Sequence, residues 1–176
     1  MKRLVIFLMA VVITGTSFAQ DVFDKFESDT KVTSFVATAK MFKLIRDIDF
    51  DTDDPEAQAY KDLIDNIDYI RVFVAEDATA RADMNTTVTQ YLKTNTGLEE
   101  LMRVNSEGKK VRFYSKDGES EGFVKELLMH VTGDMDGKQM AVIMSLTGDL
   151  NLAQISKLTK DLNLPGSDEL KNLNKN

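Results

Sequence analysis

The chain contains no cysteine and only one histidine among its 176 residues. Without cysteine there can be no disulfide framework, no thiol nucleophile, no cysteine-ligated zinc and no lipid attachment at an N-terminal cysteine. Any acid–base or metal chemistry near neutral pH would have to centre on His130, the only side chain with a suitable unperturbed pKa. Stability must therefore come from packing alone, and several classes of enzyme are excluded.

The sequence also lacks the motifs that would complete a catalytic site around His130. No serine lies in a nucleophile elbow, and there is no glycine-rich phosphate loop. The nearest acidic residue in the same expected strand is Glu126, about 13 Å away at ~3.3 Å per residue. We therefore expect a protein that is not an enzyme and needs no cofactor, with His130 as a strand residue near the end of a sheet.

At the N-terminus, Lys2 and Arg3 precede an apolar run over residues 4–13. At ~1.5 Å per residue this run covers about 15 Å, half of the ~30 Å that a membrane span must cross. Ser17 and Ala19 supply the small residues of a cleavage site. The pattern predicts a signal peptide over residues 1–19 and export to the periplasm or medium, without a lipid anchor or stable membrane insertion.

The remaining chain is acidic. The whole sequence has 22 basic and 29 acidic residues and a net charge of −7, and removing Lys2 and Arg3 leaves −9. A surface of this sign repels phosphate backbones, so nucleic acid is excluded as a partner. Its length suits one domain, which we place at residues 20–163, followed by a polar flexible tail over residues 164–176.

Turn signals in the C-terminal half predict a four-stranded antiparallel meander. The dipeptides at 107–108, 117–118 and 136–137 each end in glycine, which accepts the positive φ of tight hairpin turns. The sequences HVTGDM and SLTGDL, starting at residues 130 and 145, are interpreted as two strands that both stop at Gly-Asp. The expected strands cover roughly residues 99–105, 110–116, 121–132 and 139–148.

The N-terminal half alternates between strand and helix patterns. Residues 31–37 and 67–75 are rich in β-branched and aromatic residues and predict strands. Helices are predicted around Met41 to Ile48, around Tyr60 to Ile67, after the cap Asp77 with a buried stripe of Met84, Val88, Tyr91 and Leu92, and after the cap Asn151. The predicted fold is α+β with two layers: a mixed β-sheet made of two βα units and the meander, with helices on one face.

Two acidic segments are candidates for cation binding. Residues 47–54 include Asp49, Asp51 and Asp53. A calcium loop has glycine at position 6 and glutamate at position 12, and a loop that starts at Asp47 or at Asp49 has neither residue there. The segment fits better as a solvated loop in which Asp54 caps a helix that begins at Pro55. Residues 133–137 offer Asp134 and Asp136 but resemble a hairpin turn. We expect neither segment to be a metal site. Calcium binding by one of them, at weak candidate residues, is the alternative function.

Arg112, Tyr114 and Lys116 form a speculative interaction surface. They alternate with Val111 and Phe113 along one strand, so the two sets face opposite sides of the sheet. If helices cover only the other face, these three side chains are exposed, and tyrosine and arginine are enriched in binding hot spots. The partner that we expect is another envelope protein, and the oligomeric state stays open.

Two stretches carry a family resemblance. Residues 98–131 (LEELMRVNSEGKKVRFYSKDGESEGFVKELLMHV) and 140–162 (MAVIMSLTGDLNLAQISKLTKDL), behind a signal peptide and a short βα segment, resemble the DUF4252 family of exported Bacteroidota proteins. The resemblance spans nearly the whole mature chain and implies a compact α+β domain in the cell envelope. It implies no activity and no catalytic residues. Proximity of its members to genes for alternative sigma factors and membrane anti-sigma factors suggests a role in envelope-stress signalling.

Overall fold

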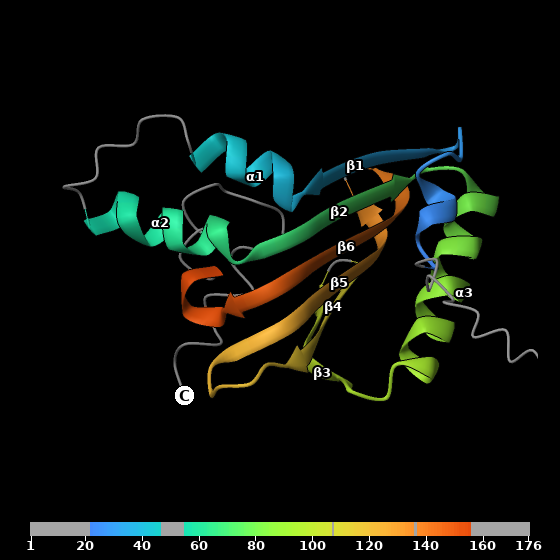
Figure 1. Cartoon of the computed structure of the whole chain (residues 1–176). Helices are drawn as coiled ribbons and strands as arrows, with labels where there is room; N and C mark the ends of the chain where they lie inside the picture. The colour runs from blue at the N-terminus through green and yellow to red at the C-terminus, as the bar shows by residue number, and fades with distance from the viewer. Residues whose placement is uncertain (1–21, 47–54, 107, 136, 156–176) are drawn as a thin grey trace, which may run out of the picture.

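Six strands form one open sheet in which every neighbouring pair is antiparallel (Figure 1). The computed structural model describes residues 22–46, 55–106, 108–135 and 137–155. The strand order is β1-β2-β6-β5-β4-β3. The strands are β1 (Val32–Thr38), β2 (Ile67–Ala75), β3 (Leu98–Ser106), β4 (Lys109–Asp117), β5 (Phe123–Met135) and β6 (Lys138–Asn151). The helices are the 3₁₀ turn η1 (Asp24–Phe26), α1 (Ala39–Arg46), α2 (Pro55–Asp65) and α3 (Ala78–Thr94).

The α+β class and the meander β3-β4-β5-β6 are confirmed, but the predicted mixed sheet is wrong. β1 and β2 are joined through α1 and α2 and pair antiparallel. α3 then carries the chain to the far edge, so β2 and β3 run in the same direction but are separated by three strands. No two neighbouring strands are parallel, because the connection through α3 places β3 at the opposite edge of the sheet and not beside β2.

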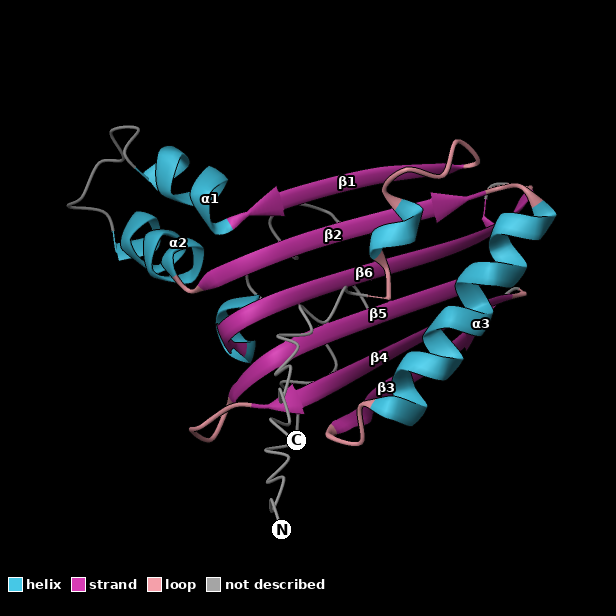
Figure 2. Cartoon of the chain, turned by 45° about the vertical axis from the view of Figure 1, so that its right-hand side comes forward, coloured by secondary structure: helices cyan, strands magenta, loops and turns pink. Residues whose placement is uncertain are grey.

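Helices pack on both sides of the sheet, so the expectation of helices on one face is not confirmed. α3 lies across one face together with η1 (Figure 2), and its side chains share a core with Phe73, Leu128 and Ile143. α1 and α2 instead contribute Phe42 and Leu63 to a second core that contains alternate residues of the same strands. Because the side chains of a strand alternate between faces, β4, β5 and β6 bury apolar residues on both sides.

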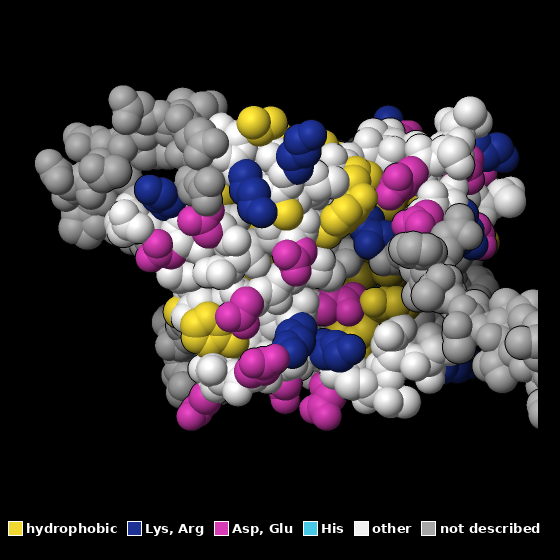
Figure 3. Space-filling model, viewed as in Figure 1, with side chains coloured by type: hydrophobic (Ala, Val, Ile, Leu, Met, Phe, Trp, Pro, Cys, Tyr) yellow, Lys and Arg dark blue, Asp and Glu magenta, His cyan; other side chains and the backbone are white. Residues whose placement is uncertain are grey.

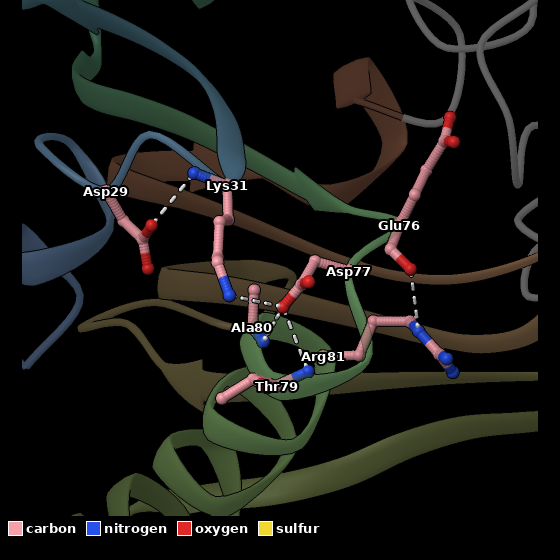
Figure 4. Close-up of polar contacts among 7 residues, drawn as sticks. All are labelled: Asp29, Lys31, Glu76, Asp77, Thr79, Ala80 and Arg81. Carbon is pink, nitrogen blue, oxygen red and sulfur yellow. Dashed lines mark hydrogen bonds and ion pairs between the residues drawn. The ribbon is translucent and has the colours of Figure 1, made fainter.

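α3 begins where the sequence predicts. The carboxylate of Asp77 accepts hydrogen bonds from the backbone N–H groups of Thr79 and Ala80, both at 3.0 Å (Figure 4). The Lys31 ammonium lies 3.2 Å from the same oxygen, and these hydrogen bonds and this charge lower the pKa of Asp77. Met84 and Val88 of the predicted stripe are buried. Asn151 likewise caps the helical residues 152–155 that follow β6, whereas the predicted cap Asp54 lies outside the described residues.

The repeated Thr-Gly-Asp sequences do not end their strands, so that interpretation is wrong. β5 and β6 continue through Gly133 and Gly148 to residues 135 and 151. Both glycines have positive φ, +120° and +147°, and a Cβ at either position would overlap a backbone carbonyl oxygen, of Gly108 and Asn66 respectively. The repeated Thr-Gly-Asp sequence therefore marks two positions at which a strand passes very close to the backbone of another segment. Only glycine fits at these positions.

The connection after Asp117 is longer than a tight turn. β4 ends at Asp117 and β5 begins at Phe123, and the residue with φ of +79° in this loop is Gly122. Gly118 instead allows close approach to Phe123, to whose carbonyl oxygen its N–H donates at 2.9 Å. The predicted turns at 107–108 and 136–137 are better supported, since Gly108 and Gly137 adopt left-handed φ values of 79° and 80°.

The predicted signal peptide (1–19) and tail (164–176) lie outside the described residues, so their roles stay predictions. Within the described part of the chain, none of the helices combines the length and the apolar character that a membrane crossing requires.

Candidate functional site

In the part of the chain that the structure describes, β1 forms an edge of the sheet without the charges, proline or bulge that usually protect an edge against pairing. Its seven residues, VTSFVAT, include no charged residue and no proline, and its pairing with β2 shows no bulge. Among the described residues β1 pairs with β2 alone. Phe35, the central residue of the strand, is 51% exposed. An uncharged edge of this kind offers a row of N–H and C=O groups to any extended segment that approaches it.

The opposite edge, β3, is protected in two ways. Its sequence carries Glu99, Glu100 and Arg103, and its pairing with β4 is interrupted by a register shift between Glu100 and Met102. Glu100 forms ion pairs with Arg103 at 2.6 Å and with Arg112 at 3.3 Å. Charges and a bulge both discourage edge-to-edge pairing, so the two edges of this sheet differ in their capacity to accept a further strand.

α1 extends the apolar surface from the end of β1. Met41 and Leu44 are 41% and 63% exposed, while Phe42 between them is buried. Lys40 and Lys43 are exposed on the same helix, which contains no acidic residue. Figure 3 shows hydrophobic side chains at the surface over α1, beside Lys and Arg side chains. We call the exposed residues Phe35, Met41 and Leu44, together with the free edge of β1, the β1 edge site.

The predicted interaction surface of Arg112, Tyr114 and Lys116 is corrected by the position of α3. Tyr114 is only 8% exposed and belongs to the core between the sheet and α3. Arg112 is partly covered and pairs with Glu100, and Lys116 is exposed beside Gly97. The alternation along β4 is as predicted, but the face that we expected to be open is the face that α3 covers.

The candidate cation sites are not assembled by the described residues. Asp49, Asp51, Asp53 and Asp136 lie outside them. Asp134 accepts a hydrogen bond from the Gly137 N–H at 2.9 Å, which is the turn role that the sequence favours. Among the described residues no group of three or more His, Asp or Glu side chains could hold a metal ion. Calcium binding by 47–54 or 133–137 stays a prediction.

His130 lies on β5 beneath α3, where its Nε2 is 2.9 Å from Oδ1 of Asn85. Burial, together with the nearby positive charge of Arg112, lowers the pKa of His130 from 6.5 to about 4. The imidazole is therefore neutral near pH 7. Because Asn85 Oδ1 can only accept, Nε2 carries the proton of the neutral ring and donates it. The sequence placed His130 in a strand but gave no indication of this partner on α3.

The neutral state of His130 predicts an acid-sensitive contribution to stability. Its folded pKa is depressed, so the unfolded chain binds the proton more tightly and the contribution, complete above pH 6.5, declines as the pH falls toward 4. Between pH 7 and pH 5 we expect wild type to lose about 2 kcal/mol more unfolding free energy than His130→Gln, as measured by urea unfolding. Equal losses in the two proteins would contradict this assignment.

The β1 edge site was missed at the sequence level. The strand at 31–37 was predicted, but its place at an edge depends on pairings between distant segments. A signal was nevertheless present, because a strand of seven residues without charge lies directly before a helix segment with Lys40 and Lys43.

Comparison with known proteins gives one family match. The model of a domain of unknown function, DUF4252, matches residues 26–158. The match covers both edge strands of the sheet, β1 and β3, and every helix and strand from β1 to β6. The search of curated proteins found no match.

Proposed function

We propose, for a chain that belongs to the DUF4252 family of domains of unknown function, a role as a non-catalytic interaction module of the cell envelope. The observation that carries the proposal is the unprotected edge of β1 with Phe35 exposed at its centre. The module accepts an extended segment of another envelope protein as a seventh strand. Export of the chain to the periplasm is part of this proposal, and the link to envelope-stress signalling stays a prediction.

Main-chain hydrogen bonds to β1 supply affinity in this mode, and side-chain contacts supply specificity. Phe35, Met41 and Leu44 offer apolar contacts to alternate residues of the incoming strand. Lys40 and Lys43 lie beside them on an otherwise acidic protein of net charge −7. Charge complementarity therefore favours a partner segment that is apolar at its centre and acidic at the end that meets α1.

A second copy of the chain fits the same edge less well. The β1 and α1 segments of a second copy contain no acidic residue and carry the same lysines, Lys40 and Lys43. A second copy therefore lacks the acidic end that charge complementarity favours at this edge. The proposal therefore commits to a different protein as the partner.

Photocrosslinking from position 35 tests the proposal. With benzoylphenylalanine in place of Phe35 in the exported chain, we expect a crosslink to an extended, apolar and acidic segment of one envelope protein. The same group in place of Thr89, which is exposed on α3, serves as the matched control and should not capture that segment.

A charge at the edge should remove the interaction. Phe35→Lys introduces the kind of residue that blocks edge pairing in natural sheets, whereas Thr89→Lys adds the same charge elsewhere. We expect Phe35→Lys to abolish co-purification of the captured protein and Thr89→Lys to leave it unchanged. Capture of a second copy only, or equal capture from positions 35 and 89, would defeat the proposal.

A further inference from the structure

A cavity of about 310 Å³ lies between the N-terminal half of α3 and the neighbouring ends of β4, β5 and β6. Its size is at the lower end of the range for small-molecule sites, ~300–1,000 Å³. None of the described residues that line it is acidic. Its lining residues are Arg81, Asn85, Gly108, Lys110, Thr132, Gly133, Gln139 and Met140.

Two cations face this cavity from different elements. Arg81 on α3 donates through Nε to the Glu76 carbonyl oxygen at 3.1 Å, which holds the side chain in place. Figure 4 shows the guanidinium extending away from the Asp77 cap. Lys110 is exposed on β4. In the described part of the chain neither Arg81 nor Lys110 forms an ion pair with a carboxylate.

Three described carboxylates that lie close to the lining residues in the sequence have other partners. Glu76 lies 3.0 Å from the Lys138 ammonium, and Asp83 lies 2.7 Å from that of Lys25. Asp134 accepts from the Gly137 N–H. Among the described residues, the acidic side chains nearest to Arg81 along the chain are therefore engaged with other cations.

Asn85 adds a neutral donor of fixed orientation. Its Oδ1 accepts from His130, whose partial burial lowers its pKa and keeps the imidazole neutral. The amide NH₂ group is thereby turned away from His130 and left to donate elsewhere. Arg81 and Asn85 are four residues apart on α3 and so lie on the same side of the helix. Thr132 and Gln139 supply further polar groups from β5 and β6.

We propose that this cavity binds a small organic phosphate monoester. Two cations and an oriented amide donor match a doubly charged oxyanion, and a guanidinium fork is suited to its oxygen atoms. The volume of the cavity is several times the ~30 Å³ that one water molecule occupies in the liquid. The cavity therefore has room for a phosphate together with a small polar group. The hydroxyl of Thr132 and the amide of Gln139 suit hydroxyls on that group. This site is independent of the β1 edge site, which lies at the sheet edge opposite β3 and β4.

Calorimetric titration of the full chain with glycerol 3-phosphate, inorganic phosphate and glycerol tests the proposal. We expect millimolar or tighter binding of glycerol 3-phosphate, weaker binding of inorganic phosphate and none of glycerol. Affinity should fall with added salt, because the contacts are charged and partly exposed. Absence of binding at millimolar glycerol 3-phosphate, or equal binding of glycerol, would overturn the proposal.

Variants locate the binding within the molecule. Lys110→Gln removes one exposed cation that forms no ion pair with a described residue, and Asn85→Ala removes the oriented amide. We expect about tenfold weaker binding for Lys110→Gln, as for loss of a hydrogen bond to a charged group. Lys93→Gln, an exposed lysine at the other end of α3, makes the same charge change and should leave the affinity unchanged. Equal losses in Lys110→Gln and Lys93→Gln would show a nonspecific charge effect only and would overturn the site.

Discussion

Replacing Gly148 by alanine is expected to destabilise the fold by about 3 kcal/mol or more, because two penalties combine at one position. The φ of +147° is one that residues with a side chain rarely adopt. The added Cβ would also overlap the carbonyl oxygen of Asn66, at the junction between α2 and β2. That oxygen accepts from the Asp149 N–H at 3.0 Å, so it cannot move away without losing this hydrogen bond.

Gly97→Ala provides the matched control for the glycine prediction. A Cβ at Gly97 meets only the flexible side chain of Lys116, at ordinary contact distances of 3.5 Å and more, and its φ is not in the left-handed region. We expect Gly133→Ala to behave like Gly148→Ala, because its Cβ would overlap the Gly108 carbonyl oxygen. Chemical denaturation measures all three. Similar stabilities for Gly148→Ala and Gly97→Ala would refute the close approach described here.

Truncating Phe73 to alanine is expected to lower the unfolding free energy by about 3–5 kcal/mol, the usual loss for a buried phenylalanine. Phe73 is fully buried on β2, and its ring centroid lies 6.4 Å from that of Phe23 and 5.7 Å from that of Phe26. The side chain thus anchors η1 to the sheet, and its removal leaves a cavity beneath that turn.

Phe35→Ala is the corresponding control for the aromatic prediction. The same atoms are removed, but Phe35 is half exposed at the sheet edge, so we expect a change below about 1 kcal/mol. The comparison also separates stability from function, since Phe35 is proposed to act in binding. A loss in Phe35→Ala as large as that in Phe73→Ala would place Phe35 in the core and remove the basis for the β1 edge site.

Local signals in the sequence predicted much of the fold. The strand at 67–75 has the predicted limits, since β-branched and aromatic residues mark it clearly. Asp77 caps α3 as expected, because its carboxylate has a local target in the N–H groups of the first turn. Glycine after an acidic residue correctly indicated the hairpins around residues 107 and 136.

Features that depend on distant segments were not predictable in the same way. Tyr114 shares its side of β4 with Arg112 and Lys116 and so resembled an exposed residue, yet α3 crosses over it. The sequence could not show which strand would form an edge, because β1 becomes one only when β2 pairs with β6 on its other side. Arg81, Asn85 and Lys110 likewise meet only through the crossing of α3 over the sheet.

Amide hydrogen exchange on the full chain, alone and in complex with the protein captured from position 35, tests the central claim most directly. If a partner strand pairs with β1, the amides of Val32–Thr38 that face the free edge become protected, while those of β3 at the opposite edge exchange as before. Unchanged exchange along β1, with new protection on β3 or α3 instead, would contradict the account.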